Sequence, residues 1–357
     1  MRKLAIIISI LIVFFPVCSG AFETVIIDEV KYEASFASSA IQPMEYLKIP
    51  FGTEDSKVGG FDQDPQTISE GVPYAFLPMN DGSVLLPDTV NQKVKHFSPT
   101  GKVLGTLPVG NFHHEKPTVI RDFAVSPQEI GIFSPFACEF KNPKLEFRNG
   151  LYLACTSDAK IELIDSLGNL KAEFDEMLDV SNIGVDPKGN LLVSNPVLAS
   201  LFRFSPDGKL IEKFVNQPNL TTYSDSNGNP YGIRGNDLTA VLYKAINASP
   251  VKELEIANFV LDLPPERNAV YVIHKVLGTD ILGNVFIQLE ACDKESVIHS
   301  EKIIIVNPDG KIVSQRDLME KPYYSTQLPR TLRVMPDGRL MGFSANEKEY
   351  IIFVYPL

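Results

Sequence analysis

Cysteine is scarce in this chain, which has 4 cysteines among 357 residues. One of them, Cys18, falls in an N-terminal segment that is expected to be removed. The other three, Cys138, Cys155 and Cys292, are too few for a disulfide framework, and no pair has the Cys-x-x-Cys spacing of a zinc site. Cys138 and Cys155 are closest in sequence and remain open to a disulfide, with three buried free thiols as the alternative.

Positive charge is also in short supply. Lys and Arg number 33 against 44 Asp and Glu, which gives a formal net charge of −11. Nucleic acids and anionic membrane surfaces are bound through a basic face, so the composition argues against both as partners. Beyond the N-terminus no apolar run approaches the roughly 20 residues that a spanning helix needs. We therefore expect no integral membrane segment in the mature chain.

The N-terminus has the three parts of a secretory signal. Basic Arg2 and Lys3 precede an apolar run over residues 4–17, and small residues follow at 19–21. We predict that residues 1–21 are a signal peptide. Its removal would place the mature chain outside the cytoplasm, secreted or in a periplasmic or extracellular space.

Two alternatives to cleavage remain. A retained membrane anchor is one, although the apolar run is shorter than a spanning helix requires. Lipid attachment at Cys18 is the other, although bulky residues at 15–17 precede this cysteine where small ones are expected. After the signal we expect an N-terminal extension over residues 22–44 and one folded domain over residues 45–357.

A helical period is absent from the rest of the chain, because turn residues interrupt every apolar run before an ordinary helix could form. Short strand patterns around glycine turns recur instead. In residues 81–104, DGSVLLPDTVNQKVKHFSPTGKVL, the two glycines lie 19 residues apart, and residues 188–214 repeat both the order and the spacing. Weaker copies begin near Gly150, Gly228, Gly283 and Gly338. In the copy at Gly283 the next turn glycine follows 27 residues later, which predicts a longer loop between its middle strands.

A further strand-like segment precedes each copy. The six segments are YAFLP, RDFAVS, NIGVD, LTTYSD, YVIHKV and TLRVM, which begin at residues 74, 121, 182, 220, 271 and 331. Each unit then has four short strands, with Gly, Asn or Asp supplying the positive φ angles of the turns. Six such units predict an all-β fold, a six-bladed β-propeller of four-stranded antiparallel blades.

The two ends of the domain support a closed ring. The last unit runs out after its third strand, YIIFVYPL, while EYLKIPF at residues 45–51 is a spare strand near the mature N-terminus. Pairing these two strands would complete the last blade and join both chain ends in it.

The best unit resembles the NHL repeat. The residues that carry the resemblance are Gly82, Asp88, Asn91, Lys93, Phe97 and Gly101. The match is moderate at residues 181–214 and weak elsewhere, so the resemblance implies the propeller fold over residues 45–357. We predict that Asp88 and Asn91 fix a turn through side-chain hydrogen bonds, with a place on a binding rim as the alternative.

Familiar catalytic motifs are missing. The chain has no Gly-x-Ser-x-Gly elbow, no reactive cysteine context and no phosphate-binding glycine loop. His113, His114 and Glu115 attract attention as metal ligands, but adjacent side chains of an extended segment point to opposite faces. A polar loop between the first two units is the simpler interpretation.

Polar residues on the predicted inner strands are the candidate site, because these strands converge on the central channel of a propeller. The six candidate ligand-binding residues are Arg121, Asp122, Asn182, Tyr223, His274 and Arg333. Propellers similar to this one include calcium-dependent lactonases and phosphotriesterases, which hold a metal on the axis with carboxylates and Asn. Asp122, Asn182 and Asp186 would be the oxygen ligands, but the cationic residues at the same level suit an anion better. We therefore predict no cofactor, with an axial calcium as the alternative.

Two segments break the repeat. Residues 127–148 contain four phenylalanines and look like an insertion in the second unit, and residues 257–268 look like a linker between the fourth and fifth. The aromatic insertion could form a contact surface or pack on its own blade.

Together these features predict a secreted binding or scaffold module whose partner is a protein or an extracellular polymer. The alternative is an enzyme, a metal-dependent hydrolase or lactonase acting in the axial channel. A structural ring without a discrete ligand is a third reading that the sequence does not separate from the first.

Overall fold

The structure is a computed structural model. It describes residues 23–25, 31–35, 40–60, 73, 75–79, 81–88, 90–108, 120–125, 139–141, 144–146, 151–155, 161–164, 170–174, 182–195, 198–206, 209–236, 239–248, 251–262, 271–295, 298–318, 332–346 and 348–356. Every element in this part is a β-strand, and none of it forms a helix with the length and hydropathy of a membrane span. The predicted signal peptide at 1–21 lies outside the described residues.

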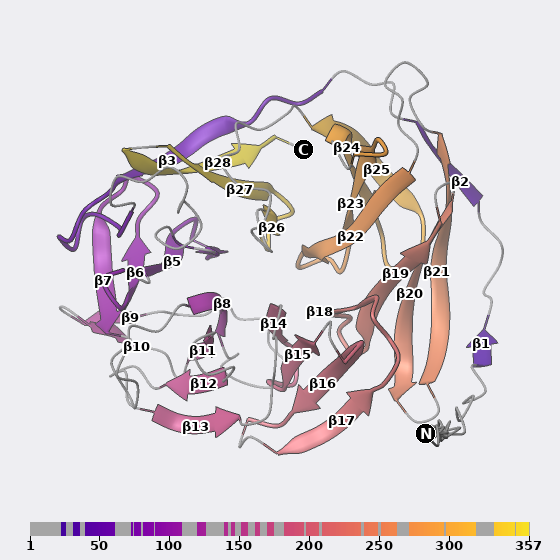
Figure 1. Ribbon diagram of the computed structural model, residues 1–357, viewed down its shortest axis with the longest axis horizontal. Helices are drawn as coiled ribbons and strands as arrows, with labels where there is room; N and C mark the ends of the chain where they lie inside the picture. Colours follow the sequence, from indigo (N-terminus) through magenta and orange to yellow (C-terminus); the bar gives the residue numbers. More distant parts are fainter. Residues whose placement is uncertain are drawn as a thin grey trace, which may run out of the picture.

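Six sheets surround a common centre (Figure 1). Each contains four strands that pair antiparallel with their neighbours. Sheet 1 is β4 (Leu77–Pro78), β5 (Val84–Asp88), β6 (Lys93–Phe97) and β7 (Val103–Pro108); sheet 2 is β8 (Ile120–Val125), β11 (Leu151–Cys155), β12 (Ile161–Ile164) and β13 (Leu170–Phe174). Sheet 3 is β14 (Asn182–Val185), β15 (Leu191–Asn195), β16 (Ser200–Phe204) and β17 (Leu210–Phe214).

The second half of the ring follows the same order. Sheet 4 is β18 (Leu220–Ser224), β19 (Pro230–Gly235), β20 (Thr239–Ala248) and β21 (Val251–Asp262); sheet 5 is β22 (Tyr271–Thr279), β23 (Val285–Cys292), β24 (Ile298–Val306) and β25 (Ile312–Leu318). Sheet 6 is β26 (Leu332–Val334), β27 (Leu340–Ala345), β28 (Glu349–Tyr355) and β3 (Met44–Pro50). The predicted fold, an all-β propeller of four-stranded antiparallel blades, is confirmed.

Sheet 6 joins the first strand of the predicted 45–357 domain, β3, to the last strand of the chain, β28. β3 pairs antiparallel with β28, and the register runs from Glu349 opposite Pro50 to Val354 opposite Met44. The predicted closure by a strand near residues 45–51 is therefore confirmed, and the N-terminal strand is the outermost of its sheet (Figure 1).

The core lies between neighbouring sheets. Side chains alternate along each strand, so one half of a buried strand packs toward one neighbouring sheet and the other half toward the next. In β23, where every residue is buried, Ile287 and Leu289 join a cluster with Phe259 and Leu242 of sheet 4. Phe286 from the same strand joins a different cluster with sheet 6. Sheet 5 is therefore held through both of its faces.

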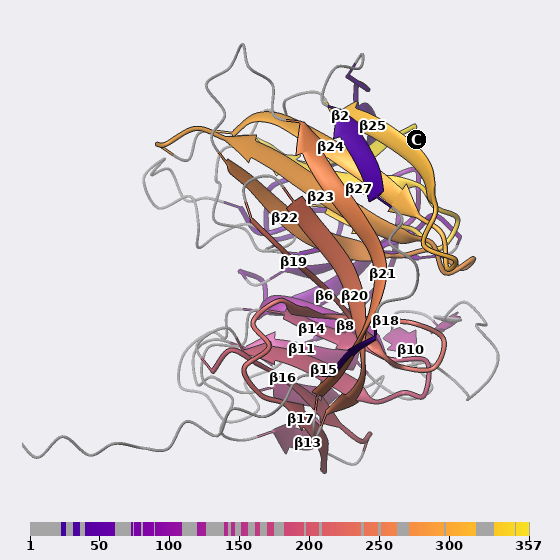
Figure 2. The same ribbon diagram turned by 90° about the vertical axis from the view of Figure 1, so that its right-hand side faces the viewer.

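Sheets 4 and 5 depart from the predicted loops. The wide glycine spacing after Gly283 lengthens β23 and β24 to 8 and 9 residues and leaves a short connection between them, so the predicted long loop is wrong. The predicted linker at 257–268 is also wrong in its first half, because residues up to Asp262 belong to the 12-residue β21. Phe259 and Leu261 there are buried in the core. Figure 2 shows these long strands side by side.

The aromatic insertion forms two strands. β9 (Glu139–Lys141) and β10 (Lys144–Glu146) make a hairpin, and Lys144 of β10 pairs in parallel with Thr106 of β7. The described part of the insertion, β9 and β10, therefore extends the outer edge of sheet 1 rather than sheet 2.

Candidate functional site

The inner strands of the sheets form the wall around the centre of the ring (Figure 1). β8 lies against β14, β14 against β18, β18 against β22, and β22 against β26. β4, the inner strand of sheet 1, has only two residues. The wall is therefore thinnest between β26 and β8.

Asp122 and Arg333 meet across that thin place. The Nη2 atom of Arg333 on β26 lies 2.8 Å from Oδ1 of Asp122 on β8. The other carboxylate oxygen, Oδ2, accepts the N–H of Ile183 on β14 at 2.9 Å. Asp122 and Arg333 are 0% and 5% exposed. One carboxylate thus holds together strands from sheets 2, 3 and 6, and Arg333 reaches past sheet 1 to do so.

Close backbone contacts continue the wall around the rest of the ring. A Cβ on Gly184 of β14 would clash with the carbonyl oxygen of Thr222 on β18. A Cβ on Gly278 of β22 would lie 3.3 Å from Val334 on β26 and 3.4 Å from Tyr223 on β18. Glycine is needed at position 184 because the two inner strands approach each other there without room for a side chain.

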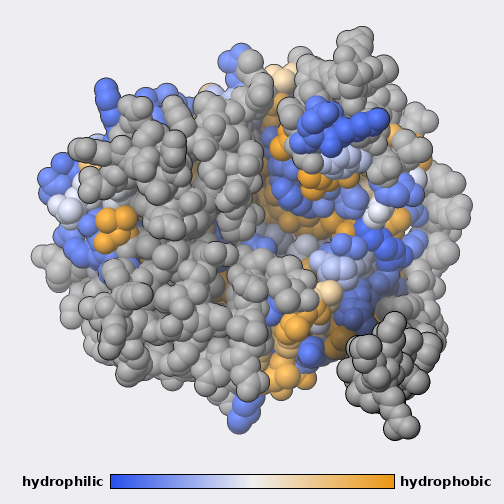
Figure 3. Space-filling view, viewed as in Figure 1, coloured by the Kyte–Doolittle hydropathy of each residue, from blue (hydrophilic) through white to orange (hydrophobic). Residues whose placement is uncertain are grey.

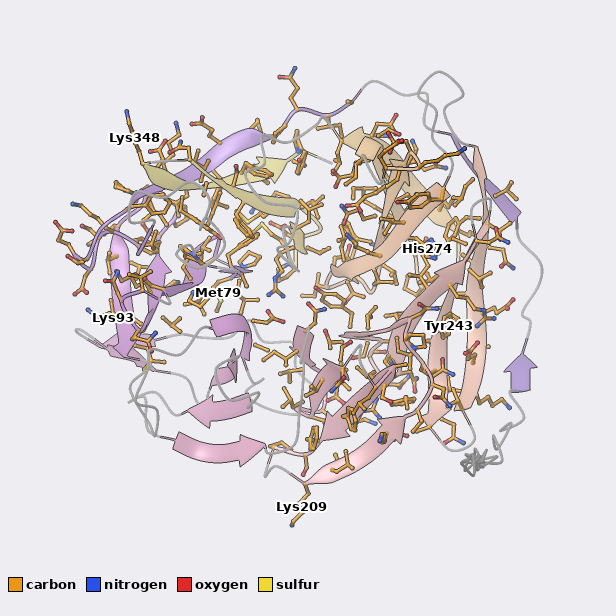
Figure 4. All side chains as sticks on the ribbon, in the orientation of Figure 1. Met79, Lys93, Lys209, Tyr243, His274 and Lys348 are labelled. Carbon is orange, nitrogen blue, oxygen red and sulfur yellow. The ribbon has the colours of Figure 1, made fainter. Side chains whose placement is uncertain are left out.

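The other predicted site residues are dispersed. Asn182 is half-buried on β14, next to the Ile183 that bonds Asp122, and Tyr223 packs against the core between sheets 4 and 5. Figure 4 places His274 on the side of β22 toward β19, away from the centre of the ring. The side chain of Arg121 lies outside the described part. The structure therefore brings together two of the six candidates, Asp122 and Arg333, and leaves their predicted role in ligand binding untested.

The Asp122 carboxylate at the centre is engaged by the protein itself. Both oxygens of Asp122 already have protein partners. Among the described residues, no group of three or more His, Cys, Asp or Glu side chains is placed to hold a metal ion. His113, His114 and Glu115 lie outside the described chain, as do the side chains of Cys138 and Cys155. Cys292 is a buried free thiol, and burial raises its pKa.

Sequence reasoning missed a serine–histidine pair in sheet 1. The Ser83 hydroxyl donates to Oδ1 of Asp81 and also contacts Nε2 of His96. Burial lowers the pKa of His96 to about 4, although the charge of Asp81 acts in the opposite direction. Asp81 binds the serine rather than the histidine, and Ser83 and His96 are 1% and 2% exposed. Ser83 and His96 are therefore a buried pair linked to the exposed Asp81, and their burial leaves a substrate no access to the hydroxyl.

The predicted turn at Asp88 and Asn91 is confirmed. Oδ1 of Asp88 accepts the N–H of Asn91 at 3.2 Å, and Oδ2 accepts the Asn91 amide at 2.8 Å. Oδ1 also accepts the N–H of Gly59 at 2.9 Å, and Lys95 forms a fully buried ion pair with Oδ2 at 2.8 Å. In sheet 3 the N–H of Leu198 donates to Oδ1 of Asn195, which stands at the end of β15 as Asp88 stands at the end of β5.

The turn between the first two strands is the most regular feature of sheets 3, 4 and 5. It has the sequence Asp-x-x-Gly-Asn at residues 186–190, 225–229 and 280–284. In all three copies Oδ1 of the aspartate accepts the backbone N–H groups two and four residues later, and Oδ2 accepts the asparagine amide, at 2.7–3.0 Å. The glycines have φ of 79 to 84°, in the left-handed region that glycine adopts without strain.

One of these turns carries a different tip. In sheet 5 the two unconstrained positions hold Ile281 and Leu282, which are 55% and 74% exposed. The same positions hold Pro187 and Lys188 in sheet 3 and Ser226 and Asn227 in sheet 4. The hydrogen bonds of the turn need only the aspartate, the glycine and the asparagine, so they do not explain two large apolar side chains in solvent. Comparing the three copies in the sequence would have revealed this pair.

A second group of exposed apolar side chains lies on β17 and the residue that follows it. Leu210, Ile211 and Val215 are 45 to 54% exposed, and hydrophobic residues gather over this part of the rim in Figure 3. Glu212 and Lys213 stand between them, the first paired with Arg203 and the second over the Phe202 ring. Charged residues within an edge strand are a common protection against pairing with another chain.

Comparisons with known proteins add no family. No family model matches the chain, and no curated protein matches it. Similar solved structures include a candidate exported protein from Bacteroides fragilis, with a TM-score of 0.48, 10% identity and coverage of 92% of this chain and 99% of that one. A streptogramin B lyase has a TM-score of 0.44, 13% identity and coverage of 88% and 92%. The PQQ-bound aldose sugar dehydrogenase of Streptomyces coelicolor has a TM-score of 0.44, 13% identity and coverage of 83% and 95%. Similarities at this level assign no activity to the chain.

Proposed function

We propose that this protein is an exported β-propeller that works by binding a partner, a protein or an extracellular polymer. The ring serves as a rigid frame that holds turns and loops from several sheets in one composite surface. The exposed pair Ile281 and Leu282 is the observation that carries the proposal. Covering these exposed apolar side chains with a partner would gain roughly 25 cal/mol of binding free energy for each Å² removed from water.

The surroundings of the pair support the same role. The N–H of Ile281 donates to the carbonyl of Pro336 at 2.9 Å, so the turn of sheet 5 is fixed against the first turn of sheet 6. That neighbouring turn presents an exposed ion pair between Asp337 and Arg339 at 2.8 Å. An apolar centre beside solvated charges is the usual arrangement of a protein-binding surface.

The finer features of the proposal are as follows. The six sheets support six blades, and the turn at Asp88 and Asn91 supports an NHL-like blade pattern. Export rests on the predicted signal at residues 1–21. Binding at the axis would use the half-buried Asn182 and Tyr223, since Asp122 and Arg333 are engaged with each other.

A comparison of variants tests the binding role. Ile281→Ser with Leu282→Asn gives sheet 5 the tip of sheet 4 and keeps the N–H that bonds Pro336. Val313→Asn is the matched control, because Val313 is 55% exposed on the same sheet but outside the turn. Labelled mature protein is incubated with intact cells of the producing organism and with their secreted proteins, and the bound fraction is measured.

We expect wild type and the Val313 variant to be retained equally and the double variant to lose at least about tenfold in retention, which corresponds to about 1.4 kcal/mol. Equal retention of all three proteins would contradict the assignment of the turn. Metal analysis with and without chelator, followed by thermal melting, tests the alternative of metal-dependent hydrolysis. Stoichiometric calcium whose removal lowers the melting temperature would favour that alternative.

A further inference from the structure

The outer edges of the sheets are treated unequally. A strand at the edge of a sheet exposes unpaired N–H and C=O groups that can pair with another strand. Added strands extend sheet 1 through β10 and sheet 4 through β1 (Glu23–Val25) and β2 (Lys31–Ser35). Within the described residues, no added strand lies on the outer edge of sheets 2 or 3.

The edge of β21 accepts the N-terminal segment in two stretches. β1 pairs with it in parallel, from Glu23 opposite Lys252 to Val25 opposite Leu254. β2 also pairs in parallel, from Lys31 opposite Asn258 to Ser35 opposite Asp262. β1 and β2 lie along the right-hand rim of the molecule beside β21 (Figure 1).

A β-bulge lies between the two stretches of β21 that pair with β1 and β2. The register of β20 against β21 shifts between Leu242, which is opposite Ala257, and Tyr243, which is opposite Glu255. Ile256 is therefore the extra residue, and a bulge bends its strand and interrupts the ladder. The bulge falls between the two paired stretches, so the edge has two separate acceptor segments rather than one continuous one.

The added segment is held by few pairs at the end of the chain. The two stretches contain 3 and 5 residues, and chain ends fray unless they are tied down. Cleavage after residue 21, as the sequence predicts, would leave β1 starting at the second residue of the mature chain. Such a segment can leave its own edge and enter an identical edge on another molecule.

We propose that the outer edge of β21 is a strand-binding site for β1 and β2 of this chain, residues 23–25 and 31–35, and that it accepts these strands from a second copy as well as from its own. A segment from either molecule makes the same backbone hydrogen bonds with β21. The two forms therefore differ only in the concentration at which the segment is presented to the site. A tethered segment has an effective concentration in the millimolar range. In dilute solution each molecule therefore occupies its own site, and exchange appears when a site is vacated.

Two proline substitutions vacate the site without shortening the chain. Successive N–H groups of a strand point to opposite edges, so changing both Tyr32→Pro and Glu33→Pro removes one N–H that faces β21. Asp28→Pro with Glu29→Pro is the matched control, because residues 28 and 29 lie between the paired stretches. Both variants keep the full mature chain, and their ring is checked by circular dichroism.

The probe is a fluorescent peptide of residues 22–39 with the natural sequence. We expect saturable binding to the Tyr32/Glu33 variant, and binding about tenfold or more weaker to wild type and to the Asp28/Glu29 control, because their sites are occupied. A peptide with the two prolines at 32 and 33 should not bind. Backbone amides of residues 252–262 should exchange faster in the vacated variant and regain protection with the peptide.

Mixing intact molecules tests directly whether the edge of β21 accepts the segment of a second copy. Wild type added to the vacated variant at millimolar concentration, which matches the effective concentration of the tethered segment, should form a mixed dimer by light scattering, and the free peptide should dissociate it. The proposal is overturned if the vacated variant does not bind the peptide, if exchange at residues 252–262 is unchanged by the prolines, or if no mixed dimer forms. These outcomes do not involve Ile281 and Leu282, so they leave the proposed partner-binding role to its own test.

Discussion

The buried ion pair between Asp122 and Arg333 offers the sharpest test of how the ring is held together. Asp122→Asn keeps an oxygen that can accept the N–H of Ile183 but removes the negative charge. Arg333, which is 5% exposed, would then be a buried cation without its partner. Removing one member of a buried pair costs about 3 to 5 kcal/mol, so we expect a loss of that size in the free energy of unfolding.

A double-mutant cycle separates the pair from its surroundings. Arg333→Met alone leaves the carboxylate of Asp122 buried without the guanidinium that neutralises it, and should cost a similar amount. In the combination of Asp122→Asn with Arg333→Met neither charge is present, and replacing a whole buried pair with apolar or neutral groups is often close to neutral. The sum of the two single losses in unfolding free energy should therefore exceed the loss in the double variant by at least about 2 kcal/mol.

Urea unfolding followed by tyrosine fluorescence and circular dichroism measures these differences. The reasoning fails if Asp122→Asn changes the free energy of unfolding by less than about 0.5 kcal/mol, the range of an ordinary surface substitution. It also fails if the two single losses add in the double variant, because independent effects would mean that the pair does not interact. Loss of binding with unchanged stability would instead identify Asp122 as a ligand contact.

Three further predictions concern other parts of the ring. His96 should lower the free energy of unfolding by up to about 3 kcal/mol as the pH falls from about 6.5 to about 4. In that window the unfolded chain binds a proton that the buried imidazole does not. His96→Gln should remove this part of the pH dependence of urea unfolding. Gly184→Ala should lower the free energy of unfolding by about 1 to 3 kcal/mol through overpacking against Thr222, and a melting temperature equal to that of wild type would contradict the close contact between β14 and β18. Gly228→Ala, at φ 84°, should cost about 1 to 2 kcal/mol without affecting the far side of the ring, which amide exchange would show.

The repeat could be predicted because each turn carries its own chemistry. Aspartate and glycine at fixed offsets determine a turn locally, and the alternation of apolar residues then places the strands on either side. The predicted inner strands at residues 182–186 and 220–225 agree with β14 and β18 within a residue. The closure by β3 could also be predicted, because the last unit has only three strands of its own and residues 45–51 form a strand that belongs to no other unit.

Strand length could not be predicted from spacing. Twenty-seven residues between Gly283 and Gly310 are compatible with a long loop or with two long strands, and the choice depends on whether a partner covers them. β23 is buried along its whole length because sheets 4 and 6 lie on its two faces. The end of β21 has the same ambiguity, because the burial of Phe259 depends on packing between sheets 4 and 5.

The candidate site shows the same limit. Asp122 and Arg333 could both be predicted as channel residues from their place on inner strands. Their pairing could not, because it joins residues 211 positions apart on the inner strands of two different sheets. A polar residue on an inner strand can face a ligand or tie two sheets together, and only the neighbouring strand decides which.

The separation of these roles leads to a last prediction. If Asp122 and Arg333 close the ring and Ile281 and Leu282 contact the partner, the two sets of variants should affect different measurements. Asp122→Asn should lower the free energy of unfolding and leave partner retention unchanged at temperatures well below its melting point. Ile281→Ser with Leu282→Asn should reduce retention and leave stability within about 0.5 kcal/mol of wild type, because exposed positions outside the hydrogen bonds of a turn contribute little to folding. If either variant changes both quantities, the frame and the binding surface are not independent, and the axial residues would have to be assigned to the partner site as well.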